Sequence, residues 1–199
     1  KGNAEDLIDQ GIGKMLSALE ETGELDNTVI VFLSDHGELM GDHGTWLKGP
    51  FFYDGLVQTP LLIRAPGRTG TETDALVSSI DLFPTCCELL NIPVPYQCDG
   101  VSQTPAYDGS TPRTECLIEY RNGYLSNDDY TLVYVDKDYK FSQDQNGEFE
   151  MTDRKQDPEE NVNILANGQN PELLNEYRSK LLQMLLSTAS RFPKQYCHA

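Results

Sequence analysis

The chain has 199 residues, of which 38% are hydrophobic and 24% are charged, a composition typical of a soluble globular protein with one sizeable domain. Its formal net charge of −17 argues against nucleic-acid binding, which requires a basic surface, so any anion-binding site must be local. The chain has no run of about 18 apolar residues, and we therefore expect no membrane-spanning helix.

The first part of the chain predicts helices alternating with strands. Residues 4–21 carry apolar side chains at helical spacing, and Gly23 is placed to end that helix. Residues 28–33 are mostly β-branched or apolar and predict a buried strand, and residues 59–64 predict a second strand. A further helix is expected over residues 79–90. Strand, loop and strand flanked by helices is typical of an α/β sheet domain.

A composition break separates this part from the remainder. Residues 91–114 are rich in Pro, Gly, Asp and Thr, which are common in linkers. We therefore expect an α/β domain over residues 1–95, a linker over 96–114 and a small α+β subdomain over 115–199. In that subdomain the pattern predicts a small antiparallel sheet, with a hairpin turn at Asp136-Lys-Asp138, and an amphipathic helix. The strand-like runs are 116–121, 130–135, 139–142 and 148–151, and the helix covers about 171–187.

Two metal-ligand residue types follow the first predicted strand directly. Asp35 and His36 come at its C-terminal end, and Gly37 follows them. In open α/β sheets ligands gather just outside the carboxyl ends of strands, so the pair predicts a metal site. A plain turn at the strand end is the alternative interpretation. A carboxylate alone suits Mg²⁺ or Ca²⁺, whereas an added imidazole favours Mn, Zn or Fe.

A second polar cluster lies a few residues further on. Residues 41–48 contain Asp42, His43 and Lys48 on a glycine-rich stretch. Beside a metal, the ammonium of Lys48 would hold a sulfate or phosphate oxygen and stabilise charge in the transition state. Taken alone, a lysine is in nearly all cases a solvated surface charge.

The cysteines carry no metal or redox motif. Cys86 and Cys87 lie in an apolar helical stretch, where thiols usually pack as small hydrophobic groups. The total of five is odd and contains no C-x-x-C pair. The cysteines therefore do not indicate whether the protein occupies a reducing or an oxidising compartment, and one disulfide is possible.

Several motifs together resemble the C-terminal half of a type I, formylglycine-dependent sulfatase, a member of the alkaline-phosphatase-like superfamily. The resemblance extends over essentially the whole chain and rests on the combination of motifs. They are Ser34-Asp-His-Gly-Glu38, Gly41-Asp-His-Gly44, Trp46-Leu-Lys-Gly-Pro50, Thr59-Pro-Leu-Leu-Ile-Arg-Ala-Pro-Gly67, Ser79-Ile-Asp-Leu-Phe-Pro-Thr85 and Phe149-Glu-Met-Thr-Asp-Arg-Lys-Gln-Asp-Pro-Glu-Glu-Asn161.

This resemblance implies an α/β/α sheet domain followed by the small subdomain, and it implies roles for single residues. Asp35 matches the metal-ligand aspartate, and His36 stands where the family has a second ligand. Lys48 matches the lysine that contacts the sulfate group. His43 lies in the same motif and is a candidate catalytic residue without an assigned role. The metal is typically Ca²⁺, with Mg²⁺ or Mn²⁺ as alternatives, which corrects the softer metal suggested by the imidazole.

The family's nucleophile motif is absent. Sulfatases make formylglycine from the Cys or Ser of C/S-x-P-x-R, and no Cys or Ser of this chain has that spacing. The N-terminal aspartates that complete the family's metal site are absent too. We therefore expect a C-terminal portion that is inactive alone, with the formylglycine in a missing N-terminal half that acts as its partner.

The leading hypothesis is a metal-dependent sulfatase that hydrolyses a glycan, aryl or alkyl sulfate ester. A phosphonate or phosphodiester hydrolase of the same superfamily and a non-catalytic sulfatase-like binding module are alternatives. A phosphoethanolamine-type transferase or a two-metal mutase fits the Trp46-Leu-Lys-Gly-Pro50 motif poorly. Neither nucleic acid nor a membrane span is expected, and a periplasmic or extracellular location is favoured over the cytoplasm because relatives often act on extracellular polymers.

Overall fold

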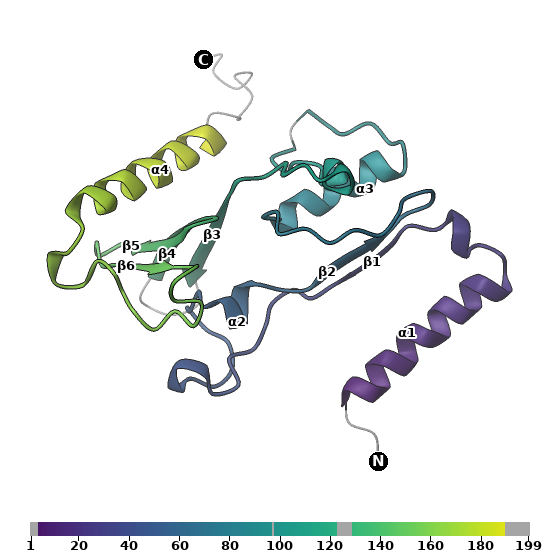
Figure 1. Ribbon diagram of the computed structural model, residues 1–199, viewed down its shortest axis with the longest axis horizontal. Helices are drawn as coiled ribbons and strands as arrows, with labels where there is room; N and C mark the ends of the chain where they lie inside the picture. The colour runs from purple at the N-terminus through teal and green to yellow at the C-terminus, as the bar shows by residue number, and fades with distance from the viewer. Residues whose placement is uncertain (1–3, 97, 123–128, 190–199) are drawn as a thin grey trace, which may run out of the picture.

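The computed structural model describes residues 4–96, 98–122 and 129–189. Figure 1 shows a two-stranded ladder with helices at one side and a four-stranded sheet with a long helix at the other. The mixed α/β architecture is the one predicted from the sequence.

The first helix, α1, covers Ala4–Glu21 as predicted. It ends at Gly23, whose φ of 72° allows the N–H of Glu24 to reach the carbonyl of Leu19 at 2.9 Å. Its apolar side chains Leu7, Ile8 and Met15 are each more than half exposed, and Figure 1 shows the helix lying apart from the rest of the molecule.

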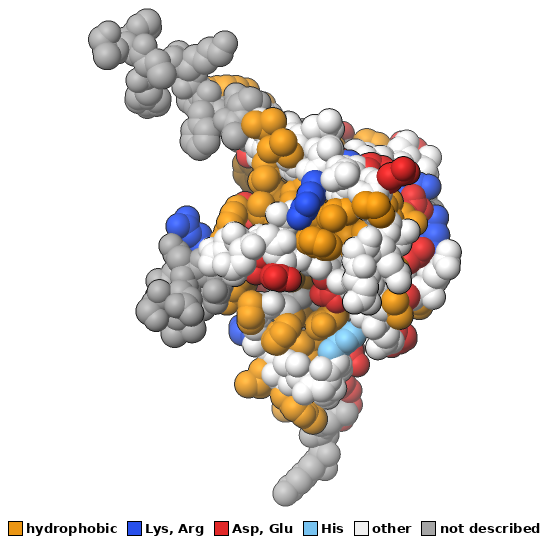
Figure 2. Space-filling model, turned by 90° about the vertical axis from the view of Figure 1, so that its left-hand side faces the viewer, with side chains coloured by type: hydrophobic (Ala, Val, Ile, Leu, Met, Phe, Trp, Pro, Cys, Tyr) orange, Lys and Arg blue, Asp and Glu red, His pale blue; other side chains and the backbone are white. Residues whose placement is uncertain are grey.

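Strands β1 (Ile30–Leu33) and β2 (Leu61–Arg64) pair in antiparallel fashion, with Ile30 opposite Arg64. Both strands were predicted, but the burial expected of the first is wrong, since Phe32 is 42% and Leu33 is 44% exposed. The reason is that, in the part of the chain that the structure describes, this sheet has only two strands. Hydrophobic side chains also reach the surface elsewhere, and Figure 2 shows patches of them separated by polar and acidic groups.

The next helical segment is organised around one buried carboxylate. A 3-10 turn, Ser79–Asp81, leads into α3 (Leu82–Leu89). Asp81 is fully buried, and the guanidinium of Arg113 donates to its two oxygens at 2.6 and 2.5 Å. The N–H groups of Ser78 and Val101 donate to it as well. Burial alone would raise the pKa of Asp81, but the bonds from Arg113, Val101 and Ser78 outweigh it and hold the pKa below its usual value.

The thiols on and near this segment are packing groups. Cys87 on α3 is buried, as the apolar helical stretch predicted, and Cys86 is partly buried. Cys116 on β3 is also buried, and the loss of solvation raises its pKa to about 11. A thiol with so high a pKa is a poor nucleophile at neutral pH. Cys197 lies outside the described residues.

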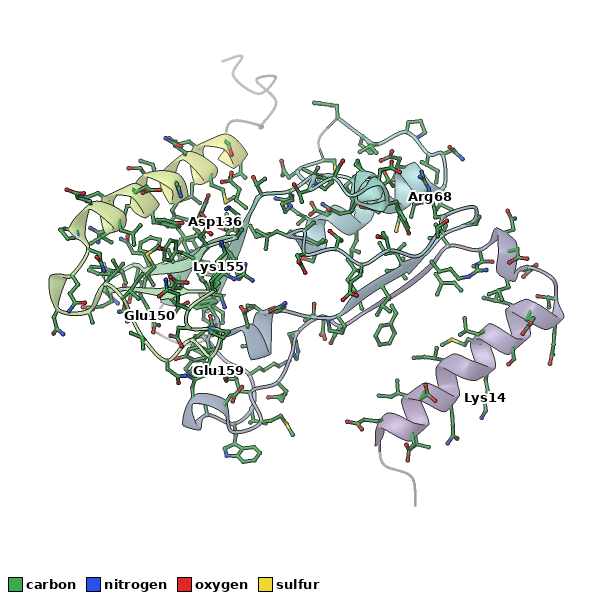
Figure 3. The ribbon with its side chains drawn as sticks, in the orientation of Figure 1. Lys14, Arg68, Asp136, Glu150, Lys155 and Glu159 are labelled. Carbon is green, nitrogen blue, oxygen red and sulfur yellow. The ribbon has the colours of Figure 1, made fainter. Side chains whose placement is uncertain are left out.

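The second sheet is an antiparallel meander of β3 (Glu115–Asn122), β4 (Asp129–Asp136), β5 (Tyr139–Asp144) and β6 (Phe149–Asp153). Each strand overlaps a predicted run. The predicted hairpin joins β4 to β5, where one carboxylate oxygen of Asp136 (labelled in Figure 3) accepts the N–H groups of Asp138 and Tyr139, both at 2.9 Å.

Helix α4 (Pro171–Ala189) covers one face of this sheet, in agreement with the predicted amphipathic helix. The core between them consists of Tyr134, Phe141, Met151, Leu165, Tyr177 and Leu181. The hydroxyl of Tyr177 donates to Asp136 at 2.7 Å, so the helix is also joined to the hairpin by a polar contact.

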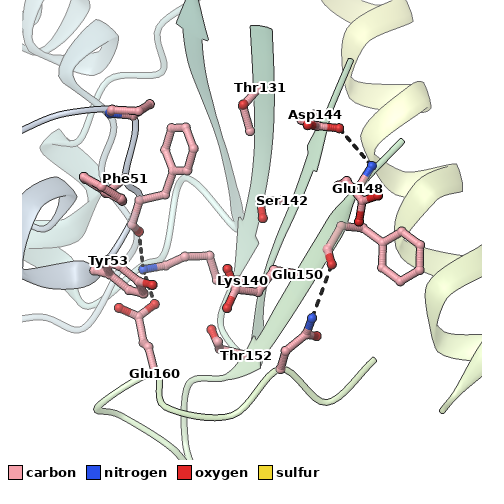
Figure 4. Close-up of a pocket in the computed structure, with 14 residues that line it drawn as sticks. Phe51, Tyr53, Thr131, Lys140, Ser142, Asp144, Glu148, Glu150, Thr152 and Glu160 are labelled. Carbon is pink, nitrogen blue, oxygen red and sulfur yellow. Dashed lines mark hydrogen bonds and ion pairs between the residues drawn. The ribbon is translucent and has the colours of Figure 1, made fainter. Parts of the chain in front are cut away.

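The opposite face of the sheet carries a buried ammonium. Lys140 on β5 is 6% exposed and forms an ion pair with Asp54. A second ion pair, of 2.5 Å, joins it to Glu160 (Figure 4). It also donates to the carbonyl of Phe52 at 2.9 Å. Glu160 in turn accepts the N–H of Asp54 at 2.6 Å, at the start of the short helix α2 (Asp54–Val57). These contacts attach the segment before α2 to the sheet.

Replacing Lys140 should therefore destabilise the protein. We expect Lys140→Met to lower the free energy of unfolding by about 3–5 kcal/mol, because two carboxylates lose their buried counterion. Urea unfolding at pH 7 measures the change. Lys137→Met is the control, since that side chain is 79% exposed and its loss should cost no more than about 0.5 kcal/mol. Equal effects of the two substitutions would contradict the assigned role.

The Asp81 and Arg113 pair predicts a defined dependence on pH. Because the pKa of Asp81 is lowered on folding, its stabilising contribution is present above the unfolded value of 3.8 and is lost as the pH falls through the folded value. Arg113→Met should cost about 3–5 kcal/mol at pH 7 and less near pH 3. Urea unfolding at both pH values tests this, with the exposed Arg121→Met as control. A cost that is the same at both pH values would contradict it.

Candidate functional site

The candidate metal ligands stand where β1 ends. The strand stops at Leu33, and Asp35 and His36 follow after one residue. The Asp35 side chain is 86% exposed, and its Oδ1 accepts the N–H of His36 at 3.0 Å. The hydroxyl of Ser34 donates to the carbonyl of His36 at 2.8 Å, which holds the turn. The strand therefore presents both side chains at the surface of the molecule.

The imidazole of His36 is oriented from both sides. Its Nδ1 lies 2.8 Å from the carbonyl oxygen of Gly37, which can only accept, so Nδ1 carries the proton. The other nitrogen, Nε2, lies 2.8 Å from the Nζ of Lys48 and 3.5 Å from Oδ2 of Asp35. In this tautomer Nε2 keeps its lone pair, which accepts a hydrogen bond from the Lys48 ammonium.

Gly37 allows the turn to lie against α2. The N–H of Gly37 donates to the carbonyl of Leu56 at 2.8 Å. A Cβ at Gly37 would stand 2.0 Å from the carbonyl oxygen of Gly55, so no other residue fits without moving the backbone. The turn that carries His36 is thus attached to α2, and through Asp54 to the buried Lys140.

The loop that follows Gly37 has a strained backbone. Met40, His43 and Leu47 all have positive φ, at 52°, 49° and 72°. Such conformations cost energy in non-glycine residues and are concentrated at binding and catalytic sites. Leu39, which is 2% exposed, is the buried residue of the loop, whereas Trp46 is 69% exposed.

His43 takes part in a different contact. Its ring stacks face to face on Tyr53, with centroids 3.5 Å apart and planes 6° from parallel. Among the described residues, no hydrogen bond or ion pair joins His43 to Asp35, His36 or Lys48. The structure therefore brings Asp35, His36 and Lys48 together. It places His43 against the ring of Tyr53, a contact that the sequence did not predict.

The donor set can form part of a cation site. Asp35 Oδ2 and His36 Nε2 lie 3.5 Å apart, and a cation, Lys48 Nζ, already lies 2.8 Å from His36 Nε2. Over the ranges that the structure describes, however, no three His, Cys, Asp or Glu side chains gather as a metal site. Because Ca²⁺ takes six to eight oxygen ligands, this pair could hold such an ion only together with further donors.

No helix in the described part of the chain has the length and apolar character needed to cross a membrane.

The chain is similar in sequence and in structure to known proteins. Residues 2–92 match the family model named Sulfatase. N-acetylglucosamine-6-O-sulfatase of Bacteroides thetaiotaomicron is 31% identical over 205 aligned positions, which cover 93% of this chain and 34% of that protein. The solved structure of a 2-O GAG sulfatase superposes with a TM-score of 0.84 at 26% identity, covering 92% of this chain and 41% of the other.

A phosphonate monoester hydrolase of Agrobacterium radiobacter is similar as well. Its structure has a TM-score of 0.81 at 29% identity over 91% of this chain and 39% of that one. The chain thus spans little more than a third of the length of the curated relatives that it matches. The predicted resemblance is confirmed: residues 2–92 match the Sulfatase family model, and the chain is similar to part of the alkaline-phosphatase-like sulfatases over nine tenths of its length.

Proposed function

We propose that this chain supplies part of the active site of a metal-dependent sulfatase that hydrolyses sulfate esters. The observation that carries the proposal is the meeting of Asp35, His36 and Lys48 at the end of β1, with Lys48 Nζ 2.8 Å from His36 Nε2. These are two metal-ligand types and one cation that can contact an anion, in a chain whose net charge of −17 would otherwise repel a sulfate ester.

Each residue has a defined part in this proposal. The Asp35 carboxylate and His36 Nε2 would hold a Ca²⁺ ion, or Mg²⁺ or Mn²⁺ in its place, with further ligands from outside this chain, once the Lys48 ammonium leaves the Nε2 lone pair that it now contacts. When bound, the ion would act as a Lewis acid on a sulfate oxygen. Lys48 contacts the sulfate group and stabilises the negative charge that develops on its oxygens. His43 lies in the loop between Gly37 and Lys48. Its stacking on Tyr53 holds that loop in place, without a contact to the sulfate.

The nucleophile must come from elsewhere. No Cys or Ser of this chain has the C/S-x-P-x-R spacing, and we propose that a formylglycine in an N-terminal half of the catalytic domain fills this role. The exposed apolar residues of α1 and β1, among them Leu7, Ile8 and Phe32, support the proposal, because such a domain would remove them from water.

A phosphonate or phosphodiester hydrolase is the second candidate. It is favoured by the similarity to the phosphonate monoester hydrolase, which is as close in fold as the sulfatases. A cationic lysine beside two metal-ligand types suits a phosphoryl oxygen as well as a sulfuryl one. The substrate that is turned over decides between the two candidates.

Activity of the chain by itself is the first test. We expect no hydrolysis of 4-nitrophenyl sulfate or of a 4-nitrophenyl phosphonate by the 199-residue chain, with or without added Ca²⁺, because it lacks a nucleophile. The assay is release of 4-nitrophenol, with intact mass confirming the chain. Turnover that EDTA abolishes would show that this chain contains a nucleophile. It would overturn the proposal that the nucleophile comes from another segment.

The role of Lys48 is tested in a form of the protein that also carries the nucleophile segment. Lys48→Ala should lower kcat/KM for the sulfate ester at least about tenfold, roughly 1.4 kcal/mol of transition-state binding. Lys14→Ala on α1 is the matched control and should leave the rate unchanged. An unchanged rate for Lys48→Ala would exclude that lysine from the site.

A further inference from the structure

The motif over residues 149–161 supplies no group to the proposed chemistry, yet its loop holds one charged side chain inside the molecule. Asp157 shapes this loop, since its carbonyl accepts the N–H of Glu160 at 3.0 Å and its carboxylate accepts the N–H of Val162 at 2.7 Å. Glu160 itself is 6% exposed and has a φ of 54°. A positive φ costs energy in a residue with a side chain, and such strain is concentrated at functional positions.

The buried carboxylate of Glu160 holds the start of α2. One of its oxygens accepts the N–H of Asp54 at 2.6 Å, and the other forms the ion pair with Lys140 at 2.5 Å. Lys140 also pairs with the Asp54 carboxylate and donates to the carbonyl of Phe52 (Figure 4). The backbone is thus held on both sides of Tyr53, by an ammonium at Phe52 and by a carboxylate at Asp54.

One route leads from α2 to the imidazole of His36. The carbonyl of Leu56 on α2 accepts the N–H of Gly37 at 2.8 Å. The carbonyl of Gly37 in turn accepts the Nδ1–H of His36 at 2.8 Å, and this bond sets the tautomer of the ring. Because α2 has only four residues, a shift at its first residue also moves Leu56. The peptide that orients the imidazole would then move with it.

A second route leads to the loop that carries Lys48. The ring of Tyr53 stacks on His43, with centroids 3.5 Å apart. His43 lies where this loop closes on itself, because the N–H of Gly41 donates to the carbonyl of Thr45 at 3.0 Å. Lys48 follows three residues later. The segment held by Glu160 therefore supports both the imidazole and the lysine of the candidate site.

We propose that Glu160 and its counterion Lys140 are positioning residues of the candidate active site. They hold α2 and Tyr53 in the places from which these orient His36 and support the loop of Lys48. Neither side chain contacts the sulfate ester, and both act through residues 52–56. The consequence for catalysis rests on the proposed function, whereas the orientation of the imidazole is measurable in this chain without turnover.

The first experiment observes the imidazole in the 199-residue chain. The sequence contains three histidines, so nitrogen-15 NMR resolves their rings, and His36→Gln assigns the signals of that residue. At pH 8, where imidazoles are neutral, we expect His36 to carry its proton on Nδ1. Glu160→Ala should shift the ring toward the Nε2–H tautomer, because the Gly37 carbonyl is no longer held in place. Glu160→Gln keeps an oxygen for the Asp54 N–H and should cause a smaller shift.

Two control variants separate positioning from a loss of stability. Arg113→Met also removes a buried ion pair and also lowers the melting temperature, but its partner is Asp81, and the His36 tautomer should stay unchanged. Glu159→Gln, at an exposed position beside Glu160, should change neither property. Circular dichroism shows that each variant is folded, and Glu160→Gln decides if Glu160→Ala does not fold. An unchanged tautomer in the folded Glu160 variant, or an equal change in Arg113→Met, would overturn the proposal.

The second experiment measures catalysis in the form of the protein that also carries the nucleophile segment. Glu160→Gln should lower kcat/KM for 4-nitrophenyl sulfate at least about fivefold, at a temperature where Arg113→Met is folded and fully active. If Lys48→Ala lowers the rate but Glu160→Gln does not, the positioning role is wrong and the proposed function stands. If Glu160→Gln alters the His36 tautomer while Lys48→Ala leaves the rate unchanged, the positioning of the imidazole is supported and the proposed function is wrong.

Discussion

The buried ammonium of Lys140 is the contact on which the arrangement of this molecule depends. It lies on β5, yet its partners are Asp54 at the start of α2, Glu160 in the loop after β6 and the carbonyl of Phe52. A buried charge without its partners is strongly destabilising, so these three segments are stable only together. The ammonium therefore joins the N-terminal part of the chain to the C-terminal sheet, on the face opposite the α4 core.

The candidate site is attached to this network through the backbone. Asp54 is the first residue of α2, the carbonyl of Leu56 on α2 accepts the N–H of Gly37, and Gly37 directly follows His36. A chain of short contacts thus leads from the sheet to the imidazole. The cost of the strained loop after Gly37 is offset by this attachment, since such conformations persist only where the surroundings hold them. The side chains of Asp35 and Lys48 are both exposed to solvent.

The local elements could be predicted because local rules decide them. The apolar spacing of residues 4–21 and 171–187 is helical, and Gly23 can adopt the positive φ that ends α1. The hairpin at residues 136–138 follows from an aspartate that can accept its own downstream N–H groups. The burial of β1 could not be predicted in the same way, because an apolar run shows only that a strand can be buried and not which element covers it.

The sequence by itself determined the succession of helices and strands, the resemblance to the sulfatases and the residue types at the end of β1, since periodicity, turn chemistry and motif spacing are properties of neighbouring positions. Tertiary structure alone decided that Lys48 reaches His36, that His43 stacks on Tyr53 and that Lys140 pairs with Asp54 and Glu160. Lys140 lies 86 positions from Asp54. Such contacts depend on how strands and loops pack in space, and this packing cannot be predicted from the pattern of neighbouring residues.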